Sequence, residues 1–161
     1  LFKMIPAQIE ENKANLLQNR VRVQFLGDRT MFPRCALDVV NSIEEETKKF
    51  DNLTLSFLFC YGGRQEILSA VKDLCKDVAS GAVSADKIDE QILRNYMWAS
   101  NLPDPDLIIR TSGISRLSNF FTFQAAYSEL MFLDRFWPEV DQECLQKCID
   151  DYIGISRNFG K

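Results

Sequence analysis

Arginine and hydroxyl side chains gather directly after a short apolar run in the second half of the chain. The run, residues 107–109, has the length and boundaries of a buried strand. Arg110 and Arg116 carry planar guanidinium groups that suit phosphate oxygens, and Gly113 between them lets the backbone approach a ligand. Three hydroxyl donors accompany them: Thr111, Ser112 and Ser118. Because open α/β proteins bind ligands at the carboxyl ends of parallel strands, the pattern indicates a diphosphate-binding loop.

The composition restricts which chemistry this loop can support. The same residue types also fit a solvated connection with surface ion pairs. Composition alone favours neither this interpretation nor the phosphate-binding loop. The 161 residues carry a net charge of -4, which argues against a general nucleic-acid binder, so phosphate affinity must come from a local cluster. The chain has no histidine, which excludes Ser-His-Asp and Cys-His catalysis and histidine metal ligands. A metal would have to bind oxygen or thiolate ligands.

The cysteine pattern predicts reduced thiols and an intracellular, cytoplasmic protein. The number of cysteines is odd, and no Cys-x-x-Cys pair suggests a zinc site or a disulfide framework. Two of them, Cys144 and Cys148, are spaced to share one face of a helix, where we expect small buried side chains. No apolar run is long enough to span a bilayer, and no signal peptide is visible. Since Leu1 falls inside an apparent helix, we expect the true N-terminus to lie upstream.

Strand and helix patterns alternate along the chain and predict a single α/β domain over residues 1–161, with an open, mostly parallel sheet flanked by helices. Residues 53–60 are apolar on both faces in their second half, which is typical of a strand in the middle of a parallel sheet. Ser84 is the expected cap of the fourth helix. The expected strands are residues 21–26, 53–60, 107–109 and 129–133, and the expected helices are 1–19, 33–50, 64–79, 85–98 and 141–159, with a helical turn or two in 120–127.

Several motifs agree in order and spacing with one known family. The chain resembles the cis-prenyltransferases, which include undecaprenyl and dehydrodolichyl diphosphate synthases, from about residue 21 to residue 160. The segments that carry the resemblance are Phe25-Leu-Gly-Asp28, Tyr61-Gly-Gly-Arg-x-Glu-Ile67, Asp104-Pro-Asp-Leu-Ile-Ile-Arg-Thr-Ser-Gly113, Arg116-Leu-Ser-Asn-Phe120, Gln124-Ala-Ala-Tyr-Ser-Glu-Leu130 and Trp137-Pro138.

The resemblance implies a reaction and its partners. Isopentenyl diphosphate would condense with an allylic diphosphate such as farnesyl diphosphate, forming a cis double bond and releasing diphosphate. The resemblance also implies a need for Mg²⁺, a homodimer, and delivery of the polyprenyl product to a membrane, to which the protein would bind peripherally.

Matching positions suggest individual roles. Arg110, Arg116 and Ser118, with Leu117 between the last two, match residues that bind the diphosphate of isopentenyl diphosphate. Glu129 matches a carboxylate that positions Mg²⁺. Without the motif, Glu129 would be interpreted as an exposed carboxylate at a strand end.

Two departures from the family pattern leave a second function open. Ile114 and Ser115 replace the glutamate and the histidine or other polar residue that commonly follow the glycine, and Asn158 replaces an arginine near the end. The family's Asp-Gly-Asn-x-Arg loop, with the catalytic aspartate, is expected upstream of Leu1, so this chain alone should be inactive and the full-length protein active. The alternative is a non-catalytic partner subunit that supports an active homologue.

Bulky residues in the second expected strand suggest a limit on product length. By the resemblance, Leu55 matches a position at the floor of the product tunnel, and Phe57 and Phe59 follow it. Their bulk would shorten the channel and the product. Ordinary packing of aromatic residues in the core explains the same pattern.

Overall fold

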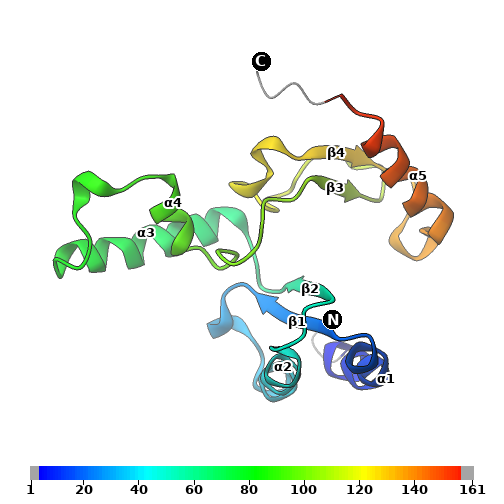
Figure 1. Ribbon diagram of the computed structural model, residues 1–161, viewed down its shortest axis with the longest axis horizontal. Coiled ribbons are helices and arrows are strands. Elements are labelled where there is room, and N and C mark those ends of the chain that lie inside the picture. The colour runs from blue at the N-terminus through cyan, green and yellow to red at the C-terminus, as the bar shows by residue number, and fades with distance from the viewer. Residues whose placement is uncertain (1–3, 157–161) are drawn as a thin grey trace. The chain divides into compact units, whose positions relative to one another are not determined.

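The computed structural model describes residues 4–156 and contains five helices and four strands within that range (Figure 1). It divides into two compact units, Leu1–Asn101 and Leu102–Lys161. Both units contain parallel strands and helices, which confirms the α/β prediction with a parallel sheet flanked by helices. The single-domain boundary stays a prediction. No helix within residues 4–156 combines the length and the apolar character needed to cross a bilayer.

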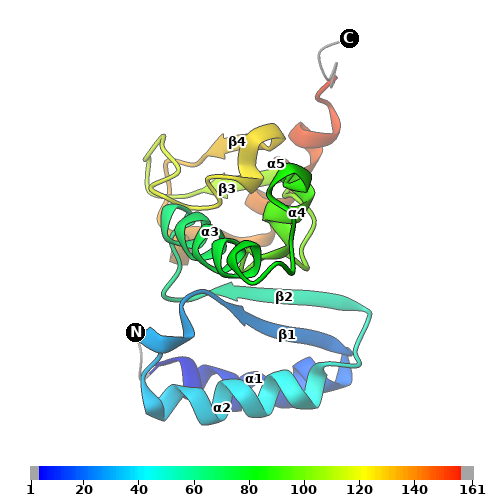
Figure 2. The same ribbon diagram turned by 90° about the vertical axis from the view of Figure 1, so that its left-hand side faces the viewer.

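The first unit is built on a parallel strand pair. β1 (Val21–Leu26) pairs with β2 (Leu53–Leu58), with Val21 beside Leu53. Helices α1 (Met4–Gln18) and α2 (Arg34–Thr47) lie together on one side of the pair, and α3 (Gly63–Ala79) lies on the other (Figure 2). The alternation in residues 21–26 puts every second side chain on the face that α2 covers. The buried cluster there comprises Ile9, Val21, Val23, Phe25, Phe32, Val40, Ile43 and Phe59.

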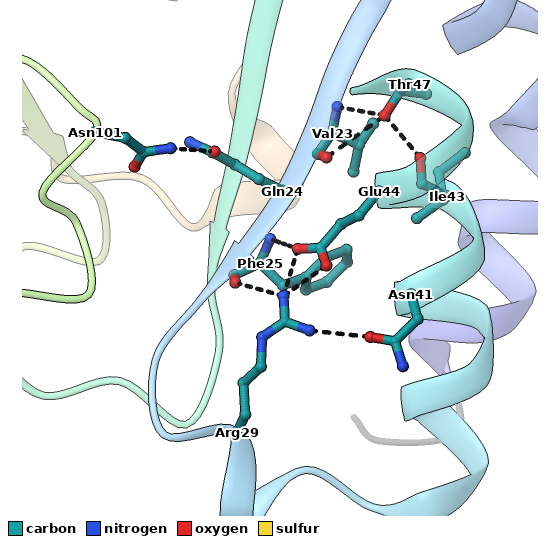
Figure 3. Close-up of polar contacts among 9 residues, drawn as sticks. All are labelled: Val23, Gln24, Phe25, Arg29, Asn41, Ile43, Glu44, Thr47 and Asn101. Carbon is teal, nitrogen blue, oxygen red and sulfur yellow. Dashed lines mark hydrogen bonds and ion pairs between the residues drawn. The ribbon is translucent and has the colours of Figure 1, made fainter. Parts of the chain in front are cut away.

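Side chains from α2 and from the segment that joins β1 to α2 close the outer edge of β1, as Figure 3 shows. The Val23 amide donates to Oγ1 of Thr47 at 3.0 Å, and the Phe25 amide donates to Oε1 of Glu44 at 2.6 Å. Nη2 of Arg29 donates to the Phe25 carbonyl at 3.3 Å and to Oε1 of Glu44 at 2.7 Å. Backbone groups that a neighbouring strand would need are therefore already bonded, and β1 is a terminal strand.

The expectation that residues 53–60 form a central strand is wrong for the described part of the chain. β2 pairs with β1 alone there, and its apolar side chains Leu53, Leu55 and Phe57 are 59%, 37% and 41% exposed. The apolar pattern indicated burial, but side chains on both faces of a strand are buried only where helices or other layers cover each face of the sheet.

After β2 the chain forms α3 (Gly63–Ala79) and a short α4 (Glu90–Asn95). The predicted helix over 85–98 with Ser84 as its cap is wrong. Residues 85–87 form a separate 3₁₀ turn, and α4 begins later because Asp89 caps it, accepting from the Ile92 amide at 2.8 Å. The hydroxyl of Tyr96 then donates to Asp77 of α3 at 2.6 Å, beyond the end of α4.

The second unit contains β3 (Leu107–Arg110), β4 (Glu129–Phe132) and α5 (Gln142–Ile153). β3 and β4 are parallel, with Leu107 beside Glu129 and Arg110 beside Phe132. The predicted start of the last helix at Asp141 is confirmed to within one residue, because Asp141 caps α5 and accepts from the Cys144 amide at 2.8 Å. The helix ends at Ile153, earlier than the predicted residue 159, whose surroundings fall outside the described residues. The predicted turn in 120–127 is confirmed as a 3₁₀ turn at Gln124–Tyr127.

Candidate functional site

The carboxyl end of β3 opens into a hollow of about 280 Å³ that combines guanidinium groups with apolar walls. Arg110 is the last residue of β3, and Arg116 and Leu117 come from the loop after it. Three of the five substrate-binding and metal positions predicted from the sequence therefore meet in one place. The lining residues are Ile108, Ile109, Arg110, Arg116, Leu117, Phe120 and Phe132.

A hydrogen bond inside the loop explains why the two arginines meet. Nη1 of Arg110 donates to the backbone carbonyl of Arg116, which folds residues 110–116 back on the strand end. The reversal also needs left-handed backbone at Ser118, Asn119 and Phe121, with φ values of 50°, 67° and 43°. Such values are uncommon for residues other than glycine and are tolerated where surrounding contacts enforce them. They cluster at binding sites often enough to mark this loop as a candidate site.

The backbone of the loop start is committed to β4 and its continuation. The Ser112 amide donates to the Arg135 carbonyl at 2.6 Å, and the Gly113 amide donates to the Leu133 carbonyl at 2.9 Å. A Cβ on Gly113 would lie 2.8 Å from Oδ1 of Asp134, and its φ is +65°. Gly113 thus accommodates Asp134 and a left-handed turn, and the expected approach of a ligand to its backbone stays a prediction.

Ser118 and Glu129 lie outside the lining of this hollow. Ser118 is exposed, one residue beyond Leu117. Glu129 is the first residue of β4, beside Leu107, so three residues of strand, about 10 Å, separate its backbone from the level of Arg110. Within residues 4–156 no group of three or more Cys, Asp or Glu side chains could hold a metal ion. The diphosphate role of Ser118 and the metal role of Glu129 stay predictions.

The three residues predicted to line the product tunnel differ in their surroundings within the first unit. Leu55 and Phe57 are partly exposed on the same face of β2, where Phe57 stacks on Phe25 with ring centroids 4.9 Å apart. Phe59 is 7% exposed and packs edge-on against Phe32 in the core. This position favours the core-packing interpretation for Phe59, whereas the tunnel role of Leu55 and Phe57 stays a prediction.

Phe120 and Phe132 are lining residues that our sequence analysis did not propose. Phe132 lies beside Arg110 in the strand register, and Phe120 follows the loop. Pairing the ends of the two predicted strands would have identified Phe132, because parallel partners in register place their side chains on the same face. The left-handed residues that bring Phe120 back to the hollow carry no comparable signal in the sequence.

Sequence comparison decides the family. The family model for putative undecaprenyl diphosphate synthase matches residues 1–160. The chain belongs to this family. The relatives include the undecaprenyl-diphosphate synthase of Thermoplasma volcanium named as geranylgeranyl-diphosphate specific, which is 42% identical over 144 residues, covering 89% of this chain and 56% of that protein. The farnesyl-diphosphate-specific synthase of Xanthomonas axonopodis pv. citri is 41% identical over 160 residues, covering 99% of this chain and 62% of that protein.

Solved structures support the fold of this member of the undecaprenyl diphosphate synthase family. Lavandulyl diphosphate synthase from Lavandula x intermedia superposes with a TM-score of 0.95 at 24% identity, covering 99% of this chain and 70% of that structure. A probable undecaprenyl diphosphate synthase from Campylobacter jejuni gives 0.84 at 27% identity, covering 99% and 73%. The chain spans little more than half the length of several curated relatives, 53% for the protein from Pyrococcus horikoshii.

Proposed function

We propose that this chain carries the isopentenyl diphosphate site of a cis-prenyltransferase. The enzyme condenses isopentenyl diphosphate with an allylic diphosphate and so extends a cis-polyprenyl diphosphate. The observation that carries the proposal is the hollow at the end of β3, where Arg110 and Arg116 line one space with five apolar side chains. A prenyl diphosphate has the matching chemistry, an anionic head on a short hydrocarbon. Membership of the synthase family supports the same substrate class.

The two arginines suit a diphosphate group that stays bound to the enzyme during the reaction and does not leave as a product. In the condensation, the allylic carbon–oxygen bond breaks and diphosphate leaves, a carbon–carbon bond forms to the isopentenyl unit, and that unit loses a proton. The isopentenyl diphosphate group stays on the growing product, so its site needs binding and orientation. Guanidinium groups supply charge-assisted, geometrically fixed hydrogen bonds for this purpose. The bond from Arg110 to the Arg116 carbonyl sets the direction of the Arg110 group before substrate enters.

We further propose that Mg²⁺ takes part and that Glu129 contributes to holding it. Mg²⁺ takes one or two carboxylates together with phosphate oxygens and water, so one half-buried carboxylate fits part of that donor set. Bound Mg²⁺ would neutralise diphosphate charge. Within residues 4–156 no group of three or more acidic or cysteine side chains forms a metal site by itself, so Glu129 is proposed as one ligand among others.

A homodimer and peripheral attachment to the cytoplasmic face of a membrane belong to the same proposal. Apolar side chains that recur every four residues along α5 support an interface between copies. Leu145, Ile149 and Ile153 of this stripe are 37%, 44% and 71% exposed. Light scattering of the full-length protein tests the dimer, and Ile149→Asp should yield monomers. The apolar product explains why the protein would visit a membrane surface.

The deciding experiment supplies the full-length protein with labelled isopentenyl diphosphate, Mg²⁺ and either farnesyl or geranylgeranyl diphosphate. We expect labelled polyprenyl products that disappear when EDTA removes the metal. Calorimetry with isopentenyl diphosphate alone separates the two candidate functions. Binding together with product formation supports the enzyme. Absence of both, in a protein that activates a catalytic homologue when mixed with it, would establish the partner subunit instead.

A further inference from the structure

A carboxyl group is completely buried in the first turn of α3. Glu66 is 0% exposed, although glutamate is almost never fully buried unless it is paired. Its Oε2 accepts from the hydroxyl of Tyr61 at 2.5 Å, and its Oε1 accepts from the Ala99 amide at 2.9 Å. Both oxygens therefore serve as acceptors for groups far apart in the sequence. A buried acceptor of this kind fixes its donors, because losing the bond would leave them unsatisfied.

The two donors belong to segments that flank the strand pair. Tyr61 lies in the turn that follows β2, at the strand's carboxyl end, where α/β proteins place their ligands. Ala99 lies in the segment between α4 and β3, directly after Trp98. The rings of Tyr61 and Trp98 meet edge to face, with centroids 6.0 Å apart and planes at 69°. Glu66 thus holds an aromatic pair by bonding one ring directly and the other through the next residue.

A second set of hydrogen bonds holds the same segment to the sheet. Nδ2 of Asn101 donates to Oε1 of Gln24 at 2.8 Å (Figure 3), and Nε2 of Gln24 donates to Oγ of Ser56 at 2.8 Å. Gln24 is only 7% exposed. Residues 98–101 are therefore fixed at one end to α3 through Glu66 and at the other to β1 and β2.

One residue of the fixed segment, Trp98, lines a hollow in the first unit. This hollow, of about 930 Å³, lies between β1 and α3, and Trp98 lines it together with Gln65, the neighbour of Glu66. Displacing Trp98 would change both the hollow and the turn after β2, because Tyr61 contacts Trp98 and Glu66 alike. No other buried carboxyl group in the described residues bonds two separate segments in this way.

We propose that Glu66 is a positioning residue for the condensation described above, acting through Tyr61 and Trp98. The kinetic consequence of this inference rests on the proposed function. The placement of Trp98 can be measured whether or not the protein catalyses the condensation. Since Glu66 lies outside the hollow lined by Arg110 and Arg116, its loss should reduce turnover more than affinity for isopentenyl diphosphate. Misplacement of about 1 Å costs about a hundredfold in rate in well-oriented reactions.

Tryptophan fluorescence of the full-length protein gives the first test. This chain has two tryptophans, so Trp137→Phe, with any tryptophan outside this chain also replaced, leaves Trp98 as the reporter. Glu66→Leu keeps the size and removes both acceptors, and we expect red-shifted Trp98 emission with stronger acrylamide quenching. Tyr61→Phe serves if Glu66→Leu does not fold, since it removes one donor and leaves the Ala99 bond. Asp73→Leu is the matched control, because that acid lies on the same helix in an exposed ion pair with Lys76.

Kinetics of the same variants give the second test. We expect kcat to fall about tenfold to a hundredfold in Glu66→Leu, with KM for isopentenyl diphosphate within about twofold of the parent. Glu66→Gln should restore much of the rate, because its amide can accept from Ala99 and donate to Tyr61. Unchanged Trp98 emission in Glu66→Leu or Tyr61→Phe would overturn the proposal, as would a normal kcat per folded molecule. An inactive parent protein would overturn the proposed function, and the emission data would still decide whether Glu66 places Trp98.

Discussion

Arg110 bonds the carbonyl of Arg116, the very residue whose side chain joins it in lining the hollow. One guanidinium therefore has two tasks, since it shapes the loop and presents donors to an anion. Arg116 contributes its carbonyl to the first task and its side chain to the second. Substitutions at the two positions should consequently have different effects.

Arg110→Lys should weaken both loop structure and isopentenyl diphosphate binding, because an ammonium group cannot make the planar, fixed contacts of a guanidinium. We expect Kd from calorimetry to rise about tenfold to a hundredfold, as for loss of a charged hydrogen bond. Arg116→Lys keeps the carbonyl and should raise Kd less. Arg135→Lys is the control, since Arg135 is exposed and bonds Ser112 through its backbone. Equal Kd values for Arg110→Lys and Arg135→Lys would contradict the site.

Thr47→Val should destabilise the first unit. The side chain is 0% exposed and its hydroxyl bonds the Val23 amide and the Ile43 carbonyl, at 3.0 and 2.7 Å. Valine keeps the shape and leaves the amide unsatisfied, which costs about 1 to 3 kcal/mol of unfolding free energy. Urea unfolding measures the loss. Ser42→Ala on the exposed side of α2 should change stability by less than about 0.5 kcal/mol. If the two variants unfold alike, the edge contact is energetically unimportant.

Gly27→Ala should be among the most damaging single substitutions in the chain. A Cβ there would lie 2.0 Å from the Phe59 carbonyl oxygen, so the backbone of two strand ends would have to separate. We expect a loss of about 3 kcal/mol or more. Gly81→Ala is a matched control, because Gly81 also has positive φ, +79°, but open space around it. Its cost should be about 1 to 2 kcal/mol from backbone conformation alone. Thermal unfolding of both variants compares them, and similar losses would disprove the close approach.

The variants Phe57→Ala and Phe59→Ala should distinguish a residue that lines the product tunnel from a residue that packs in the hydrophobic core. Phe59 is buried against Phe32, so its truncation should cost about 3 to 5 kcal/mol. Phe57 is 41% exposed and should cost much less. If Phe57 limits product length, Phe57→Ala in the full-length enzyme gives longer polyprenyl chains on thin-layer chromatography. An unchanged product distribution would exclude Phe57 as a tunnel residue.

Cys148 should resist alkylation, whereas Cys75 should react readily. Burial, and then the neighbouring Cys144, raise the pKa of the Cys148 thiol above its ordinary 9.0, while Cys75 is exposed. Because the folded pKa is raised, the stability linked to this thiol is complete below pH 9.0 and declines as pH rises through the folded value. Iodoacetamide labelling followed by mass spectrometry should modify Cys75 first. Cys148→Ala should flatten the fall in stability above pH 9.0, and an unchanged slope would contradict the assignment.

Hydrophobic alternation and helix-capping residues predicted the strands and helices whose limits depend on short stretches of sequence. The alternation in residues 21–26 gave β1 with its correct ends, and Asp141 gave the start of α5. The Ser84 prediction failed because Asp89, five residues further along the chain, is an equally good cap inside the predicted helix. The sequence motif predicted three of the residues that line the hollow, Arg110, Arg116 and Leu117. Predicting Phe132 as a lining residue would have required the register between the two strands. Glu66 was hidden because a glutamate in a first helical turn normally serves the helix dipole at the surface. Its burial depends on Tyr61 and Ala99, which the sequence alone does not bring near it.

The closed edge of β1 limits how the first unit can assemble with other chains through strand pairing. A fibrous aggregate grows only if every chain has two strand edges that can pair, because each chain that is added must present an unpaired edge to the next chain. Thr47, Glu44 and Arg29 remove one of these edges permanently. Two copies of the first unit that met through β2 would leave only sealed edges outside, and growth would end with that pair. The polar contacts of Thr47, Glu44 and Arg29 thus make accidental strand pairing through the first unit self-limiting.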